Sequence, residues 1–287
     1  MSDPRVEAWE LSQVQLERQA LARRARLRSS ATASLSTLLV FGLLGLALVL
    51  SPGWPTVQAT FFSLDAAVDA FPAILEGFWL NIRLFLLAEP LILVLGLAVA
   101  AARVSSAPWL LPVRVIATAY TDLFRGIPTL LVVFLVCFGV PALGLQGVTT
   151  SLFWLALVAL VLSYGAYVAE VFRAGIESVH PSQVASATAL GLSNGQALRF
   201  VVIPQAVRRV LPPLLNDFVS LQKDTALVAA VGLFDALGTA SDTANYTFNY
   251  TPLVVAAGLF VALTIPLARL TDWVGRRAMQ RERAGQR

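Results

Sequence analysis

Residues 185–205 read ASATALGLSNGQALRFVVIPQ, and the interpretation of the whole chain depends on this stretch. It lies between long apolar runs, yet it is neither apolar enough to span a membrane nor charged enough to be a simple tether. Gly191 suits a left-handed helix C-terminus, and Ser193 can cap a second short helix that runs on to Pro204. The stretch therefore predicts two short helices joined at a glycine.

The loop that contains this stretch begins at His180, which is expected to be a surface residue. Pro181 stops the preceding helix, and Ser182 can cap the next one. Several side chains of the loop are too apolar to be left in water, so we expect the loop to dock against its own spans or against another protein. These side chains are Leu190, Leu192, Leu198, Phe200, Val201, Val202 and Ile203.

The composition indicates a membrane protein. Of the 287 residues, 57% are hydrophobic and 13% are charged, and the mean hydropathy is +0.74. Soluble domains are about 25% charged, which excludes an ordinary soluble fold. The net charge of +4 does not indicate nucleic-acid binding, because no basic patch with interleaved aromatic residues accompanies it. Cys137 is the single cysteine, so no internal disulfide forms, and no Cys/His cluster is present to hold a metal.

Six apolar runs are about long enough to cross a bilayer core of about 30 Å, which takes roughly 20 helical residues. The first run could be mistaken for a signal peptide. However, residues 1–30 precede it and residues 51–55 offer no small-x-small cleavage site, so we expect a retained anchor. The six runs are 31–50, 77–102, 113–141, 151–172, 211–234 and 252–270.

The arginines predict the orientation of the spans, because arginine and lysine favour the cytoplasmic side. With six spans, four groups of arginines fall on one side, and the three connections on the other side contain neither arginine nor lysine. Both termini and the 181–205 loop are therefore expected in the cytoplasm. The arginine groups lie in 18–28, at Arg103, in 199–209 and in 269–287, and the three connections are 51–76, 142–150 and 235–251.

Charged side chains inside the spans call for a partner or a water-filled cavity, because each costs about 2.5–3.5 kcal/mol at mid-bilayer. On the third span, Asp122 and Arg125 are three residues apart and can pair. They come just before Gly126 and Pro128, which are expected to break or kink the helix.

Other spans carry polar groups as well. Glu170 and Arg173 repeat the three-residue spacing near the inner end of the fourth span, where a structural ion pair is the favoured interpretation. Glu89 lies in the middle of the second span. On the fifth span, polar residues at helical spacing form one face. That face contains Asn216, Asp217, Ser220, Lys223 and Asp224.

Two interpretations of these polar faces stay open. In the first, the polar side chains line a path for a zwitterionic or charged solute. In the second, they form structural pairs such as Asp217 with Lys223 or Asp224. Both apply to Arg125, to Glu89 and to the polar face of the fifth span. Small residues in the fourth span are expected to allow close helix packing rather than to bind a ligand. They are Gly165, Ala166 and Ala169.

The chain lacks the means to bind ATP through a P-loop. That motif needs a lysine directly after a glycine, and the single lysine here, Lys223, follows Gln222. If transport is driven by ATP, the ATPase is therefore a separate chain.

Several stretches in one order resemble the permease subunits of binding-protein-dependent ABC importers, in their polar amino-acid branch. Gly191 stands four residues after Ala187 and ten before Val201, as in the "EAA" loop of that family, although Ala185-Ser186-Ala187 replaces Glu-Ala-Ala. The other stretches are YTDLFRGIP (120–128), GAYVAEVFRAGIE (165–177), ALGLS (189–193), PQA (204–206) and NDFVSLQKDT (216–225).

The resemblance implies an all-α membrane protein with the five-span core of a type I ABC importer permease and one extra N-terminal span. It implies that the loop forms coupling helices that sit in a groove of a cytoplasmic ATPase. The residues that match the loop motif are Ala185, Ser186, Ala187, Gly191, Val201, Ile203 and Pro204. The expected division is an N-terminal segment 1–30, a span 31–50, an extracytoplasmic loop 51–76, a permease domain 77–275 and a basic tail 276–287.

The resemblance also implies the partners. They are a cytoplasmic ABC ATPase dimer that uses ATP and Mg, a second permease chain, an extracytoplasmic solute-binding protein and the lipid of a bacterial inner membrane. The chain itself is expected to bind no cofactor and to have no catalytic residue. The alternative is a self-sufficient secondary transporter with Glu89, Asp122 and Asp224 as ion-coupling carboxylates, but the sequence shows no convincing internal repeat. A membrane enzyme is excluded because no nucleophile and base lie in a suitable pattern.

Overall fold

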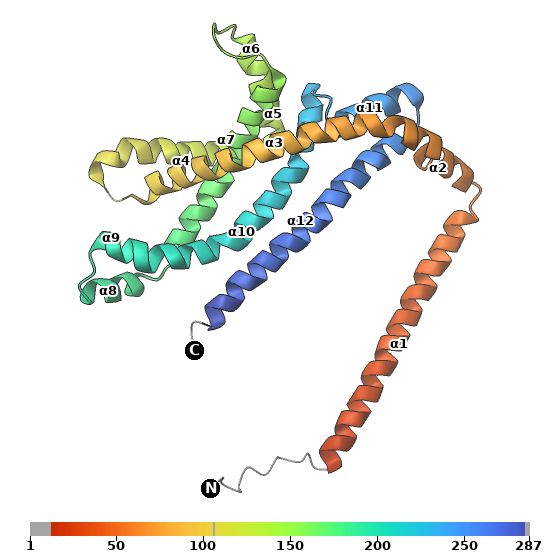
Figure 1. The fold of residues 1–287 in the computed structure, drawn as a ribbon, viewed down its shortest axis with the longest axis horizontal. Helices are drawn as coiled ribbons and strands as arrows, with labels where there is room; N and C mark the ends of the chain where they lie inside the picture. The colour runs from red at the N-terminus through yellow and green to blue at the C-terminus, as the bar shows by residue number, and fades with distance from the viewer. Residues whose placement is uncertain (1–12, 106, 285–287) are drawn as a thin grey trace. The chain divides into compact units, whose positions relative to one another are not determined.

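A computed structural model of the protein describes residues 13–105 and 107–284, and these residues form helices joined by short turns, without a strand (Figure 1). Parts of the expected N-terminal segment and of the basic tail lie outside the described residues. The helices are α1 (Gln13–Val49), α2 (Trp54–Phe61), α3 (Leu64–Val104), η1 (Pro108–Leu110), α4 (Leu111–Gly126), α5 (Thr129–Phe134), η2 (Leu135–Gly139), α6 (Val140–Ala142), α7 (Leu152–Glu177), α8 (Pro181–Ala189), α9 (Asn194–Ala197), η3 (Leu198–Val202), α10 (Ile203–Asp224), η4 (Thr225–Val231), α11 (Ala236–Thr247) and α12 (Thr251–Ala284).

The chain divides into two compact units, residues 1–59 and 60–287. In the first unit, residues 28–49 of α1 form an apolar stretch of 22 residues that is long enough to cross a bilayer. Its large apolar side chains are exposed within the chain, as Leu38 and Phe41 illustrate at 71% and 69%. This stretch therefore has the composition of a lone membrane span.

Four helices of the described residues are long and apolar enough to cross a membrane, or up to six if each of two bent helix pairs counts as one span. The bent pairs are residues 108–126 with 129–142, at 107°, and residues 195–231 with 236–247, at 47°. The first bend lies where the sequence predicted it, because α4 ends at Gly126 and Pro128 begins the next helix.

The first core helix differs from its predicted span by its length. α3 begins at Leu64 instead of residue 77 and contains 41 residues. Ser63 caps it, because its hydroxyl accepts a hydrogen bond from the backbone N–H of Ala66 at 3.4 Å. Pro72 and Pro90 lie inside this helix without ending it.

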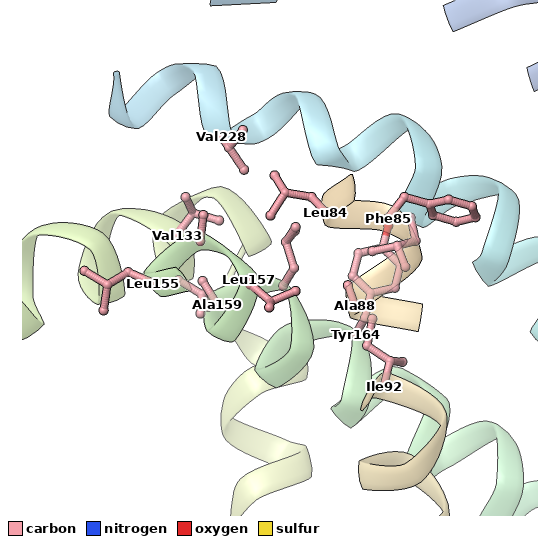
Figure 2. Packing of buried hydrophobic residues seen from close by; sticks show 14 of the residues in the cluster. Leu84, Phe85, Ala88, Ile92, Val133, Leu155, Leu157, Ala159, Tyr164 and Val228 are labelled. Carbon is pink, nitrogen blue, oxygen red and sulfur yellow. The ribbon is translucent and has the colours of Figure 1, made fainter. Parts of the chain in front are cut away.

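The main hydrophobic core lies where α3 packs against α7, with α5, α10 and η4 around them. Leu84, Ala88 and Ile92 point from α3 into this core and meet side chains of α7 such as Leu157 (Figure 2). A side chain on Gly96 would meet Val168, whose Cγ1 atom lies 2.5 Å from the position of the missing Cβ. α3 and α7 therefore pack closely enough to require a residue without a side chain at this crossing.

The small residues of α7 have the packing role that the sequence predicted. A Cβ atom on Gly165 would lie 2.8 Å from Leu95 Cδ2 and 2.9 Å from the hydroxyl of Tyr120. Ala166 and Ala169 are fully buried. These positions bring α3 and α4 close to α7, so the functional groups of all three helices converge at their ends.

Candidate functional site

The 181–205 loop forms two short helices joined at a glycine, as predicted. α8 and α9 lie together at one end of the molecule, beside the start of α10 (Figure 1). Gly191 has a φ of +88°, and its N–H donates to Thr188 at 2.9 Å. The N–H of Leu192 donates to the carbonyl of Ala187 at 3.2 Å, which completes the helix C-terminus. A residue with a side chain at position 191 would be strained by roughly 1–2 kcal/mol.

The helix starts in the loop differ in part from the prediction. His180, not Ser182, caps α8, because its Nδ1 atom accepts the backbone N–H of Ser182 at 3.2 Å. Ser193 caps α9 as expected: its hydroxyl accepts from the N–H of Gln196 at 3.4 Å, and the Gln196 side chain accepts the N–H of Ser193 at 2.9 Å. Helix α9 does not end at Pro204, because the π-helical turn η3 joins it directly to α10.

One side of the loop packs on its own chain and the other does not. Ala187 and Val202 are 4% and 7% exposed, whereas Leu190 and Phe200 are 85% and 61% exposed. The loop therefore presents an apolar surface that the described chain does not cover. Of the other residues that match the loop motif, Ala185, Ser186, Gly191, Ile203 and Pro204 are exposed and Val201 is partly buried.

An ionic cluster lies at the same end of the molecule, where the ends of α3, α4 and α7 meet. Its centre is Glu170, whose Oε2 accepts from Arg103 at 2.8 Å and from Nε of Arg173 at 3.1 Å. Arg173 also pairs with Glu177, and Arg125 Nη1 lies 3.9 Å from Glu170. The Glu170–Arg173 pair was predicted, but the part of Arg103 was not, because 67 residues separate it from Glu170.

The predicted pair between Asp122 and Arg125 is wrong. Arg125 turns toward α7, where its guanidinium lies 6.0 Å from the ring centre of Tyr167 and within reach of Glu170. Asp122 is exposed, in a shallow depression beside Arg114. The three-residue spacing permits a pair, but a partner on another helix competes for the same arginine.

A cavity of about 400 Å³ opens beside the ionic cluster, between α4, α7 and α10. Its wall contains Arg125 and Arg209 together with Glu170 and Asp217, so both signs of charge face one space. We call it the inner cavity. Arg209 also donates to the carbonyl of Ser178, which ties α10 to the residue before the loop.

The polar face of α10 does not act as one unit. The carboxylate of Asp224 accepts a hydrogen bond from the hydroxyl of Tyr164 at 2.6 Å. Among the described residues, no ion pair joins Asp217 to Lys223, so that suggested pairing is absent. Lys223 is exposed and Ser220 is half-buried.

Two further predicted residues do not line the inner cavity. Asn216 faces a separate space between α10 and α12, which we call the α10–α12 cavity. Glu89 is half-buried in α3, and within residues 13–105 and 107–284 its side chain makes no hydrogen bond or ion pair.

A buried polar network at the opposite end of α10 escaped prediction. Asn81 of α3 donates to Asp235 Oδ2 at 2.8 Å and to the Thr225 hydroxyl at 3.3 Å, and its Oδ1 accepts the N–H of Ala236 at 3.1 Å. Asp235 caps α11 through the N–H of Gly238 at 2.7 Å. All three polar side chains are 2% exposed or less.

The network reaches α12 through Gln222, a buried residue of α10. The Thr225 hydroxyl donates to the carbonyl of Gln222 at 2.8 Å, and the Gln222 side chain accepts from Thr264 at 2.7 Å. We call Asn81, Gln222, Thr225, Asp235 and Thr264 the buried network. It fixes the bend between η4 and α11 to α3 and α12.

These sites offer ion pairs, hydrogen bonds and apolar surface. No group of three or more His, Cys, Asp and Glu in the described ranges could hold a metal ion. The exposed apolar loop, the ionic cluster and the inner cavity lie near one another at the α8 end, and the buried network lies at the α11 end.

Comparison with known proteins assigns these features to a family. Residues 92–280 match the model of the "binding-protein-dependent transport system inner membrane component". The chain is 33% identical over 214 residues to the arginine transport system permease protein ArtQ of Bacillus subtilis (strain 168), covering 74% of this chain and 95% of that protein. It is also 33% identical over 237 residues to the L-cystine transport system permease protein TcyL of the same organism, covering 78% and 93%.

Solved structures give the same result for the fold. A crystal structure of an amino acid ABC transporter with histidines matches with a TM-score of 0.68 at 30% identity, over 75% of this chain and 98% of that one. An inward-facing structure of the MetNI methionine ABC transporter matches with a TM-score of 0.58 at 20% identity, over 72% and 96%. The second likeness, at low identity, concerns the fold alone.

Proposed function

The chain belongs to the family of inner membrane components of binding-protein-dependent transport systems, and we propose that it carries a polar amino acid or a related small zwitterion into the cytoplasm. It is a multi-pass permease of an ATP-driven ABC importer, and the reading as a secondary transporter is not supported. The names of its relatives, which include arginine and cystine permeases, support the proposed substrate class.

The partners of the chain follow from this proposal. An ATPase dimer uses ATP and Mg in the cytoplasm, a solute-binding protein delivers the solute from outside, and a second permease chain completes the path. Both termini and the 181–205 loop lie in the cytoplasm, and residues 1–30, 31–50 and 51–76 precede the permease domain 77–275.

The inner cavity is the proposed place where the solute passes the cytoplasmic half of the chain. A zwitterion carries one positive and one negative group, and the cavity wall offers Arg125 and Arg209 against Glu170 and Asp217. Opposite charges placed around one cavity can pair with both ends of such a solute, which offsets the cost of stripping its water.

The observation that carries the proposed coupling is the apolar surface of the loop. Leu190 and Phe200 stay 85% and 61% exposed beside a helix–glycine–helix turn that hydrogen bonds hold in place. When the partner ATPases close, this turn moves, and α7 and α10, which continue from its two ends, carry the motion to the inner cavity.

Gly191→Glu tests the coupling, with Gly191→Asn as the matched control. Asparagine tolerates a positive φ and keeps the turn, whereas glutamate adds strain and a charge to the apolar surface. We expect Gly191→Glu to insert normally but to lose ATP-dependent uptake by at least about tenfold in proteoliposomes that contain the ATPase, while Gly191→Asn keeps most of it. Uptake that survives in Gly191→Glu would show that the loop does not couple transport to ATP.

A further inference from the structure

One side of α12 is exposed between Val254 and Arg277. Val254, Val261 and Ile265 lie on this side at helical spacing and are 38%, 53% and 55% exposed. Apolar side chains on the outside of a membrane-spanning helix face acyl chains or another helix. This side of α12 therefore faces the hydrocarbon core from Val254 to Ile265.

The exposed side ends in a cationic cluster. Arg269, Trp273, Arg276 and Arg277 follow Ile265 within a little more than three turns, and all four are exposed. The guanidinium of Arg277 lies 4.3 Å from the ring centre of Trp273, which is 47% exposed. Within the described residues none of the three arginines has a carboxylate within ion-pair distance. Among the described residues, these three cations beside Trp273 thus have no ion-pair partner.

The α10–α12 cavity lies next to this cluster and has a volume of about 270 Å³. Along α12 the residues of its wall change from the apolar Ala268, through the polar Thr271 and Asp272, to the cationic Arg276. Gly275 adds no side chain to this wall, and a Cβ atom there would make an ordinary contact of 3.8 Å with Leu215 Cδ1. The cavity wall therefore combines apolar side chains such as Leu215 and Val219 with the guanidinium of Arg276, a combination that suits the acyl chain and the headgroup of a lipid.

We propose that the arginine cluster and the α10–α12 cavity form a binding site for an anionic phospholipid of the inner leaflet. The headgroup phosphate pairs with Arg276 and Arg277, Trp273 lies at the level of the headgroups, and an acyl chain follows the apolar side of α12. The proposal rests on the orientation in the proposed function, which places the end of α12 in the cytoplasm. Anionic lipid supplies the missing counter-charge, and the apolar side of α12 selects a lipid over free phosphate.

The test uses full-length protein in detergent and in nanodiscs. Native mass spectrometry with phosphatidylglycerol should show one tightly retained lipid, which dipalmitoyl phosphatidylcholine and inorganic phosphate do not replace. R276Q/R277Q should lower the affinity for phosphatidylglycerol about tenfold. R199Q/R208Q removes the same charge from exposed positions outside the cavity wall and should change the affinity less than about twofold.

Each of the following results would overturn the site. Equal losses in both double variants would show diffuse attraction to the membrane surface, and equal retention of phosphatidylcholine would show that charge is not recognised. Efficient disulfide cross-linking of Trp273→Cys between two copies in the membrane would show that a second permease covers this face. Labelling of Arg276→Cys by a reagent applied from outside would overturn the orientation as well as the site. If the protein binds phosphatidylglycerol and phosphatidylcholine alike while its ATP-dependent uptake is intact, the site alone is overturned.

Discussion

The buried network and the ionic cluster both tie α3 to later helices, but water reaches only one of them. Asn81 and Asp235 are 2% and 0% exposed, whereas the side chains of Arg103, Glu170 and Arg125 are 14%, 22% and 41% exposed. A buried polar group that loses its hydrogen-bond partner finds no water to replace that partner. Each charged group of a partly exposed ion pair can instead be solvated by water. The α11 end is therefore expected to stay fixed, and the α8 end, next to the loop, to rearrange.

The largest effect is expected from Asn81→Ala in the buried network. The change removes the donor to Asp235 and the acceptor of the Ala236 N–H, and both groups stay buried. The Ala236 N–H loses its partner, and the Asp235 carboxylate keeps the N–H of Gly238 but loses Asn81, so the free energy of unfolding should fall by about 3 kcal/mol. Unfolding by SDS in mixed micelles measures this loss.

Asn245→Ala is the matched control for this variant, because Asn245 is an exposed asparagine of α11. It should change the free energy of unfolding by less than about 0.5 kcal/mol. If the two alanine variants unfold alike, the buried network does not fix the α11 end.

An intermediate effect is expected from Glu170→Gln in the ionic cluster. The amide keeps the shape of the side chain but leaves Arg103, Arg125 and Arg173 without a carboxylate in common. Because these side chains are partly exposed, water compensates for much of the lost pairing, and the expected loss in the free energy of unfolding is about 1–2 kcal/mol. SDS unfolding of the purified variant measures it.

Glu177→Gln is the matched control for Glu170→Gln. Among the described residues Glu177 pairs with Arg173 alone, and its side chain is 52% exposed, so the expected loss is about 0.3–0.5 kcal/mol. A loss in Glu170→Gln that matched the loss in Asn81→Ala would mean that the ionic cluster is as fixed as the buried network.

The two regions also differ in how far the sequence predicts them. Glu170 and Arg173 lie three residues apart on one helix, so local spacing was sufficient to predict their pair. Asn81 and Asp235 are 154 residues apart, so no local spacing predicts their contact. Only the packing of α3 against α11 brings them together, and that packing depends on Gly77, where a Cβ atom would lie 2.5 Å from the backbone of Asp235.

The loop was predictable for a different reason. Its caps and its glycine are local signals, since each acts within about five residues, and Gly191 has the predicted positive φ. The choice of His180 over Ser182 as cap was not predictable, because both side chains can accept an N–H and the backbone path decides between them. Fold class and spans follow from composition and length, whereas partners between helices need the fold itself.

The smallest effect is expected from Asp122→Asn. This variant tests whether Arg125 pairs with Asp122 on its own helix or with Glu170 on α7. Spacing alone pairs Asp122 with Arg125, and the loss of such a pair would cost about 0.3–0.5 kcal/mol and release Arg125. In the structure Arg125 faces Glu170, so the substitution should leave the free energy of unfolding unchanged within about 0.2 kcal/mol.

A double-mutant cycle with Arg125→Gln decides the question by SDS unfolding: the coupling energy between positions 122 and 125 should be near zero, and the coupling between positions 125 and 170 should be clearly favourable. The reverse order of the two couplings would place Arg125 with Asp122 and remove α4 from the ionic cluster.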